Sequence, residues 1–569
     1  MKPANVLSAL CAALVTAAVP AAAAEGPPAS ASPVVTVAEG TVRGRLENEI
    51  QVYRGLPYAA PPVGQNRWRP PLPAPRRTSI LDASRFGPAC VQPTPRIVSI
   101  YSQDLGATSE DCLTLNIWAP PTPTTRTPVI VWIHGGALLT GSSREPLYDG
   151  GALAAKGVVV VSINYRLGVL GYLAHPELSA ESPLGVSGNY GLLDQVAALG
   201  WVQKNIAAFG GDPDNVTIAG ESAGGLSVLY LMASPLAKGL FDKAIAQSAY
   251  MISTPVLKTA RYGAPAAEQA GAALHRPLQA PGLRALRAMD AQALTDAAAA
   301  AGFSPFAAVD GVVLPDQLVE IFDRRQQADV PVLAGFNSGE IRSLRMLAPT
   351  APAQASDYER VIHARYGDLA DAFLALYPSW DMEESILANT RDALYGWTSE
   401  RLVRSQGALG KPSYLYLFDH SYPAAETAGL HAFHAAELPF MFGNLDRTPP
   451  RWPRVPQTPE HAALSQAMVD YWTSFARTGT PSAAGAAAWP PFGEAGSQMV
   501  FAGQPQVRPL PPGMFALHEQ AVCRRKSADL AWNWNTGLIS PQLTPQTHAP
   551  TPPCDPETSN SIGQGHGKP

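Results

Sequence analysis

The chain has 569 residues, of which 46% are hydrophobic and 15% are charged, and its formal net charge is −5. This composition predicts a folded protein with a large buried core and excludes an intrinsically disordered chain. No cluster of Lys and Arg forms a stripe that could neutralise phosphates. We therefore do not expect nucleic acid as a partner.

Residues 1–24 have the pattern of a secretory signal peptide. Lys2 precedes an apolar run that ends at Val19, and a run of small residues up to Ala24 resembles a cleavage site. Pro20 stops the apolar run short of the ~20 residues that a membrane-spanning helix needs. We therefore expect cleavage, no transmembrane anchor, and a protein that is secreted or periplasmic.

Cleavage would leave four of the five cysteines, namely Cys90, Cys112, Cys523 and Cys554. An even number in an exported chain predicts two disulfides, for which three connectivities exist. The order along the sequence favours Cys90 with Cys112, which closes a short loop. Cys523 with Cys554 is the weaker hypothesis, because Cys554 lies in a tail without an apolar face.

In the first half of the chain, strands and helices alternate. Residues 128–133 and 158–163 are short β-branched runs without polar alternation, which is typical of parallel strands buried on both faces. Residues 192–209 carry apolar side chains at helical spacing. A further strand is predicted at 216–219 and a helix at 226–232. This pattern indicates an α/β fold.

The second half adds a strand-like segment at 330–335 and Ala-rich segments at 255–300 and 355–400. We expect the Ala-rich segments to be helices that cap the sheet and shape a pocket. The predicted organisation is one domain over residues 25–540. Residues 541–569, rich in Pro, Thr, Ser and Gly, are expected to form a disordered tail.

The segment Gly220-Glu-Ser-Ala-Gly224 lies between a predicted strand and a predicted helix. A serine hydroxyl needs an adjacent base and a fixed, exposed position to act as a nucleophile, and Gly-x-Ser-x-Gly supplies that position in a sharp strand-to-helix turn. Ser222 is therefore the candidate nucleophile. Earlier in the chain, His134-Gly-Gly-Ala137 follows a strand, where small residues let backbone N–H groups approach an oxyanion.

With these two motifs the chain resembles the type-B carboxylesterases. This family of α/β-hydrolases includes cholinesterases and bacterial p-nitrobenzyl esterases. The resemblance covers nearly the whole mature chain. The segments that carry it are 53–64, 109–116, 189–195, 209–222, 335–340, 434–440 and 471–481.

The resemblance implies an α/β-hydrolase fold, with a mostly parallel central sheet, helices on both faces and helical cap insertions. It implies that Glu340, which ends Gly335-Phe-Asn-Ser-Gly-Glu340, is the triad acid and that His434 is the base. The N–H groups of Gly136, Ala137 and Ala223 would form the oxyanion hole. The implied reaction is hydrolysis of a small-molecule carboxylic ester through an acyl-enzyme, with no metal and no cofactor.

Rival residues exist for both partners of the nucleophile. His431 lies three residues before His434, and Glu221 is a second acid, which we expect to point away from the imidazole because it shares the turn of the nucleophile. The chain also departs from the family. Ala137 stands where a glycine is frequent, and Gln247-Ser-Ala249 stands where the strand after the nucleophile helix usually ends in glycine.

The same sequence is compatible with two other functions. A non-catalytic, cholinesterase-like binding protein would share the fold but would have no reason to keep all three triad residues. Lactonase or amidase activity would use the same residues. For an esterase with histidine as base, we expect kcat/KM to fall on the acid side with an apparent pKa of roughly 6 to 7.

Overall fold

The computed structural model describes residues 32–121, 126–493 and 496–543. The predicted signal peptide, residues 1–24, lies outside this part of the chain, as do residues 544–569 of the predicted tail. Both remain predictions. Within the described residues, no helix is long and apolar enough to cross a bilayer.

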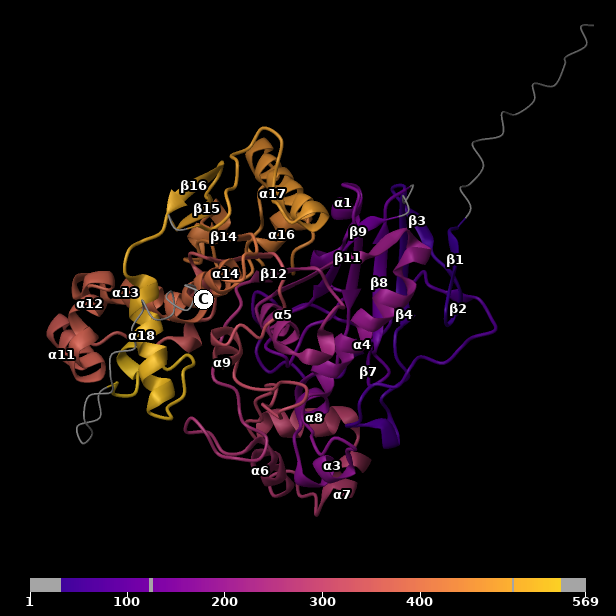
Figure 1. Cartoon of the computed structure of the whole chain (residues 1–569), viewed down its shortest axis with the longest axis horizontal. Helices are drawn as coiled ribbons and strands as arrows, with labels where there is room; N and C mark the ends of the chain where they lie inside the picture. Colours follow the sequence, from indigo (N-terminus) through magenta and orange to yellow (C-terminus); the bar gives the residue numbers. More distant parts are fainter. Residues whose placement is uncertain (1–31, 122–125, 494–495, 544–569) are drawn as a thin grey trace, which may run out of the picture.

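An 11-stranded sheet runs through the molecule (Figure 1). Its central strands, from β10 to β15, pair in parallel, and antiparallel strands complete both edges. In spatial order the strands are β16 (Pro505–Pro509), β15 (Ser497–Phe501), β14 (Ser413–Phe418), β13 (Val332–Asn337), β12 (Lys243–Gln247), β11 (Gly211–Glu221), β9 (Thr127–Ile133), β10 (Val159–Ile163), β8 (Thr114–Ala119), β4 (Ile50–Pro57) and β3 (Arg45–Glu47).

Two small sheets lie beside the large one. The first contains β1 (Val34–Val37), β2 (Gly40–Arg43) and β5 (Leu81–Asp82), and the second contains β6 (Ala89–Cys90) and β7 (Thr108–Ser109).

The strands predicted at 128–133, 158–163, 216–219 and 330–335 are confirmed as β9, β10, β11 and β13. Successive side chains of β9 enter two different cores. Val131 and Ile133 belong to one apolar cluster, whereas Ile130 and Trp132 belong to the other. Because side chains of a strand alternate between faces, both faces of the sheet are buried.

Helices cover both faces, as predicted. On one face lie α4 (Tyr190–Asn205), α5 (Ala223–Ala233), α9 (Leu318–Asp323) and α14 (Trp397–Gly407). On the other face lie α1 (Gly151–Ala154), α16 (Leu438–Met441) and α17 (Pro459–Thr478). The helix expected over 192–209 is α4. It ends at Asn205, because the chain tightens into a 3-10 turn that closes at Gly210, whose φ is +79°.

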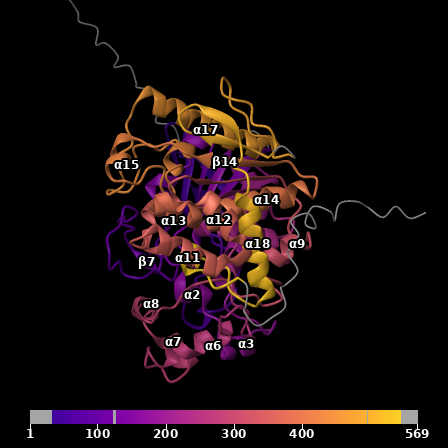
Figure 2. The same ribbon diagram turned by 90° about the vertical axis from the view of Figure 1, so that its left-hand side faces the viewer.

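The Ala-rich segments are helical and form two additional groups with their own cores. In one group, α7 (Leu283–Ala288) and α8 (Ala291–Ala300) share a core with α2 (Gly168–Tyr172) and α3 (Pro176–Glu181) from earlier in the chain, and α6 (Ala267–Ala272) packs against α3. The other contains α11 (Ala355–Tyr366), α12 (Ala370–Leu376), α13 (Met382–Arg391) and α18 (Met514–Ser527). Figure 2 shows this second group on one side of the molecule. The short helices α10 (Glu340–Ser343) and α15 (Pro423–Thr427) lie in the loops that carry the site.

The predicted disulfide between Cys90 and Cys112 is present. It closes the segment that connects β6 to β8, which we call the disulfide loop (residues 90–112). The second predicted pair involves Cys554, which lies outside the described residues, so that pairing remains a prediction. Cys523 itself is disulfide-bonded.

Candidate active site

Ser222 lies in the turn between β11 and α5, with φ +57° and ψ −122°. A residue other than glycine in this region of backbone space is strained. The two flanking glycines make the turn possible, because a Cβ on Gly220 would come within 2.5 Å of the Gly224 backbone, and one on Gly224 within 2.1 Å of the Ile133 carbonyl oxygen. The sequence thus places the serine at the end of the sheet, where strands of an open α/β fold form a crevice.

Glu340 is the first residue of α10, just after β13, and its side chain is fully buried. Its Oε1 accepts hydrogen bonds from the Ser248 hydroxyl at 2.6 Å and from the Asn337 N–H at 2.8 Å. Its Oε2 bonds Nδ1 of His434. These partners fix the carboxylate and leave one oxygen for the imidazole.

His434 comes from the loop between α15 and α16 and is 6% exposed. This loop is fastened to the segment that carries Glu340. The Gly339 N–H donates to the Ala432 carbonyl at 2.8 Å, and the Asn337 amide donates to the Phe433 carbonyl at 2.8 Å. The backbone contacts therefore bring the two segments together, although they are far apart in the sequence.

The rival histidine has a different environment. The side chain of His431 is 42% exposed, and its Nδ1 lies 2.9 Å from Oε1 of Glu426, where the two form a surface pair. Only His434 of the two lines the cavity that contains Ser222. Of the two histidines, His434 is the one that the structure brings to Glu340 and to this cavity.

Glu221 does not point away from the imidazole, and this part of the prediction was wrong. Its Oε1 lies 3.1 Å from Nε2 of His434, on the ring edge opposite Glu340. The strained backbone at Ser222 explains the difference, because it turns the chain so sharply that neighbouring side chains reach the same cavity. The imidazole is thus flanked by two carboxyl groups.

Burial and charge act in opposite directions at this pair. Burial raises the pKa of Glu221 to about 8, although the nearby imidazole of His434 lowers it. For His434, burial would lower the pKa, but the carboxyl groups of Glu221 and Glu340 outweigh it and hold the pKa above its ordinary value of 6.5. When Glu221 is protonated and neutral, the carboxylate of Glu340 still raises the pKa of His434.

The predicted oxyanion-hole residues lie beside the serine. Gly136 and Ala137 have φ of +96° and +56°, and a Cβ on Gly135 would lie 3.2 Å from Cβ of Ser222. In the described part of the chain, the N–H groups of Gly136, Ala137 and Ala223 donate to no protein acceptor. The first N–H groups of a helix have no intrahelical partner, so Ala223 is free to donate to a ligand.

A gorge of about 1040 Å³ opens above Ser222. Ser222, His434 and Ala137 line it, together with residues of the disulfide loop. Most of the larger side chains in its wall are apolar or aromatic, among them Leu139, Leu147, Tyr148, Phe303, Phe306 and Trp452. A cavity of this size and composition is typical of a small-molecule site.

Residues 31–510 match the carboxylesterase family. The chain is 38% identical over 480 residues to para-nitrobenzyl esterase of Bacillus subtilis, a comparison that covers 81% of this chain and 93% of the relative. The chain belongs to the carboxylesterase family. It is a carboxylic-ester hydrolase, and the alternative of a binding protein without activity is set aside.

Other esterases are similar to this carboxylesterase over most of their length. It is 37% identical over 486 residues to the fumonisin B1 esterase of Sphingopyxis macrogoltabida, covering 82% of this chain and 85% of the relative. Among solved structures, a Geobacillus stearothermophilus carboxylesterase superposes with a TM-score of 0.71 at 34% identity, covering 85% of this chain and 99% of that chain. The α/β-hydrolase fold is thereby confirmed.

Several site residues of the carboxylesterase were missed by sequence reasoning. Ser248, next to the Ala249 departure, donates its hydroxyl to Oε1 of Glu340. Tyr101 donates its hydroxyl to the His434 carbonyl at 2.9 Å, and the Tyr395 ring lies 5.5 Å from the imidazole. No signal in the sequence pointed to Ser248, because the departure at this point is an alanine, Ala249, where glycine is usual.

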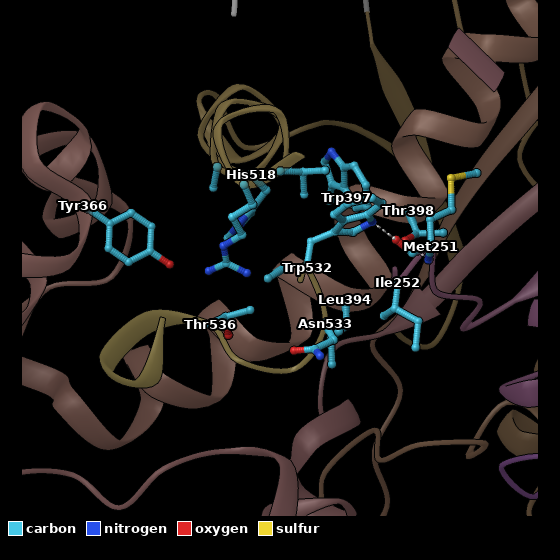
Figure 3. Close-up of a pocket in the computed structure, with 14 residues that line it drawn as sticks. Met251, Ile252, Tyr366, Leu394, Trp397, Thr398, His518, Trp532, Asn533 and Thr536 are labelled. Atoms are coloured by element: carbon cyan, nitrogen blue, oxygen red, sulfur yellow. Dashed lines mark hydrogen bonds between the residues drawn. The ribbon is translucent and has the colours of Figure 1, made fainter. Parts of the chain in front are cut away.

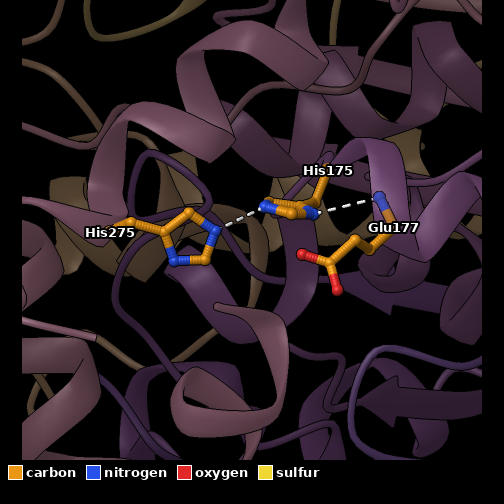
Figure 4. Close-up of side chains that lie close together, drawn as sticks. All are labelled: His175, Glu177 and His275. Carbon is orange, nitrogen blue, oxygen red and sulfur yellow. Dashed lines mark hydrogen bonds between the residues drawn. The ribbon is translucent and has the colours of Figure 1, made fainter. Parts of the chain in front are cut away.

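The carboxylesterase also contains a group of possible metal ligands away from the gorge, namely His175, Glu177 and His275 (Figure 4). Each ring nitrogen of the two histidines has a hydrogen-bond partner. Nδ1 of His175 accepts from the Glu177 N–H at 3.1 Å, so its proton is on Nε2, which lies 2.7 Å from Nε2 of His275. His275 in turn donates from Nδ1 to the Ala280 carbonyl at 3.1 Å. A metal on His175 Nε2 would have to displace that proton, so these contacts favour a neutral histidine pair.

Proposed function

We propose that this carboxylesterase cleaves esters through a Ser222–His434–Glu340 triad. The observation that carries the proposal is the hydrogen bond between Glu340 Oε2 and His434 Nδ1 at the wall of the gorge that contains Ser222. Nε2 of His434 takes the serine proton as Ser222 attacks the ester carbonyl, and later returns it to the leaving alcohol. Water then hydrolyses the acyl-enzyme by the same route.

Glu340 holds the imidazole in the tautomer that presents Nε2 to the serine and stabilises the imidazolium that forms. The N–H groups of Gly136, Ala137 and Ala223 would receive the oxyanion. Their left-handed or helix-start backbone supports this role, because it directs N–H groups out of regular hydrogen bonding. Losing one such donor typically costs about 3 to 4 kcal/mol of barrier.

The preferred substrates would be uncharged esters with bulky apolar groups. Apart from His434, the ionisable side chains in the wall of the gorge are mainly acids, and Arg96 lies at an exposed position of the disulfide loop. Burial raises the pKa of Glu145 in this wall to about 7, so it gains negative charge as the pH rises through neutrality. An anionic ester would be repelled by Glu145 above neutral pH and by Glu221 once the pH exceeds its pKa of about 8. Lactonase and amidase activities would use the same residues and belong in the same substrate panel.

We also propose that the mature enzyme is secreted or periplasmic. The pattern of residues 1–24 supports export. The disulfide between Cys90 and Cys112 supports it independently, because such bonds persist in oxidising compartments and are rare in the cytosol.

The triad is tested by replacing its members one at a time and measuring hydrolysis of a p-nitrobenzyl ester. Ser222→Ala and His434→Ala should each lower kcat by at least about 10⁴-fold, with unchanged circular dichroism. The matched control is His431→Ala, which removes the neighbouring histidine on the surface and should keep activity within about twofold. An active His434→Ala enzyme would refute the assignment of the base.

A further inference from the structure

Arg525 is a buried cation without a counter-charge. It lies in the last turn of α18 and is 2% exposed. Its two neighbours in the same turn both form ion pairs. Arg524 bonds Asp368, and Lys526 lies 3.1 Å from Asp323 and 3.3 Å from Glu320. Among the described residues, no carboxylate forms an ion pair with Arg525, although it is the most buried of the three.

The guanidinium of Arg525 has neutral partners only. Nη1 donates to Oδ1 of Asn535 at 3.2 Å, and Nη2 donates to the Asn535 carbonyl at 3.0 Å and to the Ser540 hydroxyl at 2.6 Å. Its Nε has no acceptor in the described part of the chain. Burial lowers the pKa of Arg525, and only the Tyr366 hydroxyl acts against this shift.

An arginine side chain does not escape this cost by losing its proton. The carbonyl end of α18 supplies at most about half of a negative charge, and hydrogen bonds to neutral oxygens do not cancel the remainder. A charge that is buried and unpaired is unfavourable unless an anion or polar solvent accompanies it.

A small cavity lies beside this side chain. It has a volume of about 20 Å³, and Arg525 lines it together with Tyr366, His518, Asn533 and Thr536. Tyr366 and Thr536 approach it from one side and Met251 and Trp397 from the other (Figure 3). A site needs roughly 10 to 15 Å³ to hold one water molecule. The space therefore suits one particle of that size and excludes phosphate or sulfate.

We propose that this cavity is a binding site for a monatomic anion, chloride, which serves as the counter-ion of Arg525. Nε and the hydroxyl groups around the cavity would be the donors to the ion. The ion would connect α18 to the segment 392–398, which contacts the same cavity and carries Tyr395 in the gorge wall. Chloride would thus stabilise the packing of α18 behind the active site.

The direct test is crystallographic, with bromide as the probe. Crystals of the full-length enzyme soaked in sodium bromide should show an anomalous peak in the cavity, within about 3.5 Å of a guanidinium nitrogen of Arg525. Density in the cavity for water alone, or for a carboxylate of the chain, would overturn the proposal. This measurement uses the unaltered protein and does not depend on the folding of a variant.

The second test is thermal unfolding in sodium chloride against sodium gluconate at constant ionic strength. Chloride should raise the Tm by about 1 °C for each tenfold increase above its Kd. Arg525→Met should abolish this difference. The matched control Arg524→Met, in the same helical turn, should retain it. Equal Tm values in the two salts for the wild-type enzyme would contradict the proposal.

Discussion

Glu221 and Glu340 face the two nitrogens of one imidazole, so the charge at Glu221 contributes to the pH range in which His434, as the proposed base, can accept a proton. A carboxylate 3.1 Å from Nε2 favours the imidazolium and raises the pKa of His434. The acid limb of the kcat/KM profile should therefore follow a His434 pKa of about 9, above the range of roughly 6 to 7 that the sequence predicted.

Glu221→Gln tests this relation. The amide has nearly the same shape but no charge, so the pKa of His434 should fall and the acid limb should move to lower pH. The measurement is kcat/KM between pH 5 and 9 with an uncharged ester. Asp296→Asn is the control, because Asp296 lines the gorge but its carboxylate bonds Thr94 and Gln292. A limb that stays in place or moves to higher pH would contradict the interpretation.

Ser248 is expected to hold Glu340, the proposed triad acid, in position. Ser248→Ala removes the 2.6 Å hydrogen bond to Oε1 of Glu340 and leaves only the Asn337 N–H. A hydrogen bond to a charged group contributes about 1.5 to 3 kcal/mol, so kcat/KM should fall about tenfold or more. Steady-state kinetics with one ester at the pH optimum provide the measurement.

The matched control for Ser248 is Ser465→Ala. Ser465, in α17, is also buried, but its hydroxyl donates to the Phe440 carbonyl of α16 at 2.8 Å and does not contact the Glu340 carboxylate. Its loss should lower the Tm without changing kcat/KM. Equal kinetics for the two alanine variants would show that Ser248 has no special role in positioning Glu340.

At the scale of elements, the disulfide loop forms part of the gorge wall and contacts the segment of His434. The bond between Cys90 and Cys112 closes a segment with a sequence separation of 22. Tyr101 in this loop bonds the His434 carbonyl and the Ser343 hydroxyl. Replacing both cysteines with serine should lower the free energy of unfolding by about 3 kcal/mol, measured by urea denaturation.

Activity should fall as well, because the loop would no longer hold Tyr101 against the segment of His434. Tyr101→Phe separates the two effects, since it removes the hydroxyl contacts and keeps the disulfide. We expect Tyr101→Phe to lower kcat/KM while most of the stability is retained. Full activity in the double serine variant would show that the loop is not needed to position the base.

Sequence analysis located best the elements whose local residue pattern alone determines their structure. The buried strands β9 and β10 and the turn at Ser222 follow from β-branched runs and from glycines that no other residue could replace. Glu340 and His434 were found through resemblance to a family and not from local pattern. The contact of Glu221 with His434 was mispredicted, because the direction of a side chain in a strained turn depends on backbone angles that residue types do not specify.

At the scale of the whole molecule, buried histidines set the response to acid. Burial lowers the pKa of both His134 and His518 to about 4, and they are 1% and 3% exposed. In the unfolded chain each would titrate near 6.5, so between pH 6.5 and 4 the unfolded state binds more protons. The stability that these residues contribute is fully present above pH 6.5 and is lost as the pH falls, by about 3 kcal/mol for each histidine.

Urea denaturation at pH 7, 6, 5 and 4 measures this loss. His518→Gln should weaken the pH dependence over that range, because one buried neutral histidine is removed. The exposed His363 supplies the control, and His363→Gln should leave the slope unchanged. The raised pKa of His434 makes its contribution to stability depend on pH in the opposite direction. A variant at His518 therefore reports only on a histidine whose pKa is lowered by burial. A slope unaffected by His518→Gln would contradict the assignment.

The fastening of the loop of His434 to the segment of Glu340 also has a consequence for biosynthesis. The acid and the base are 94 positions apart, and the nucleophile precedes both. A chain that leaves the ribosome from its N-terminus can form the turn at Ser222 while the base is still untranslated. If the proposed triad holds, the growing chain therefore has no complete catalytic site until His434, in the final third of the polypeptide, has been translated.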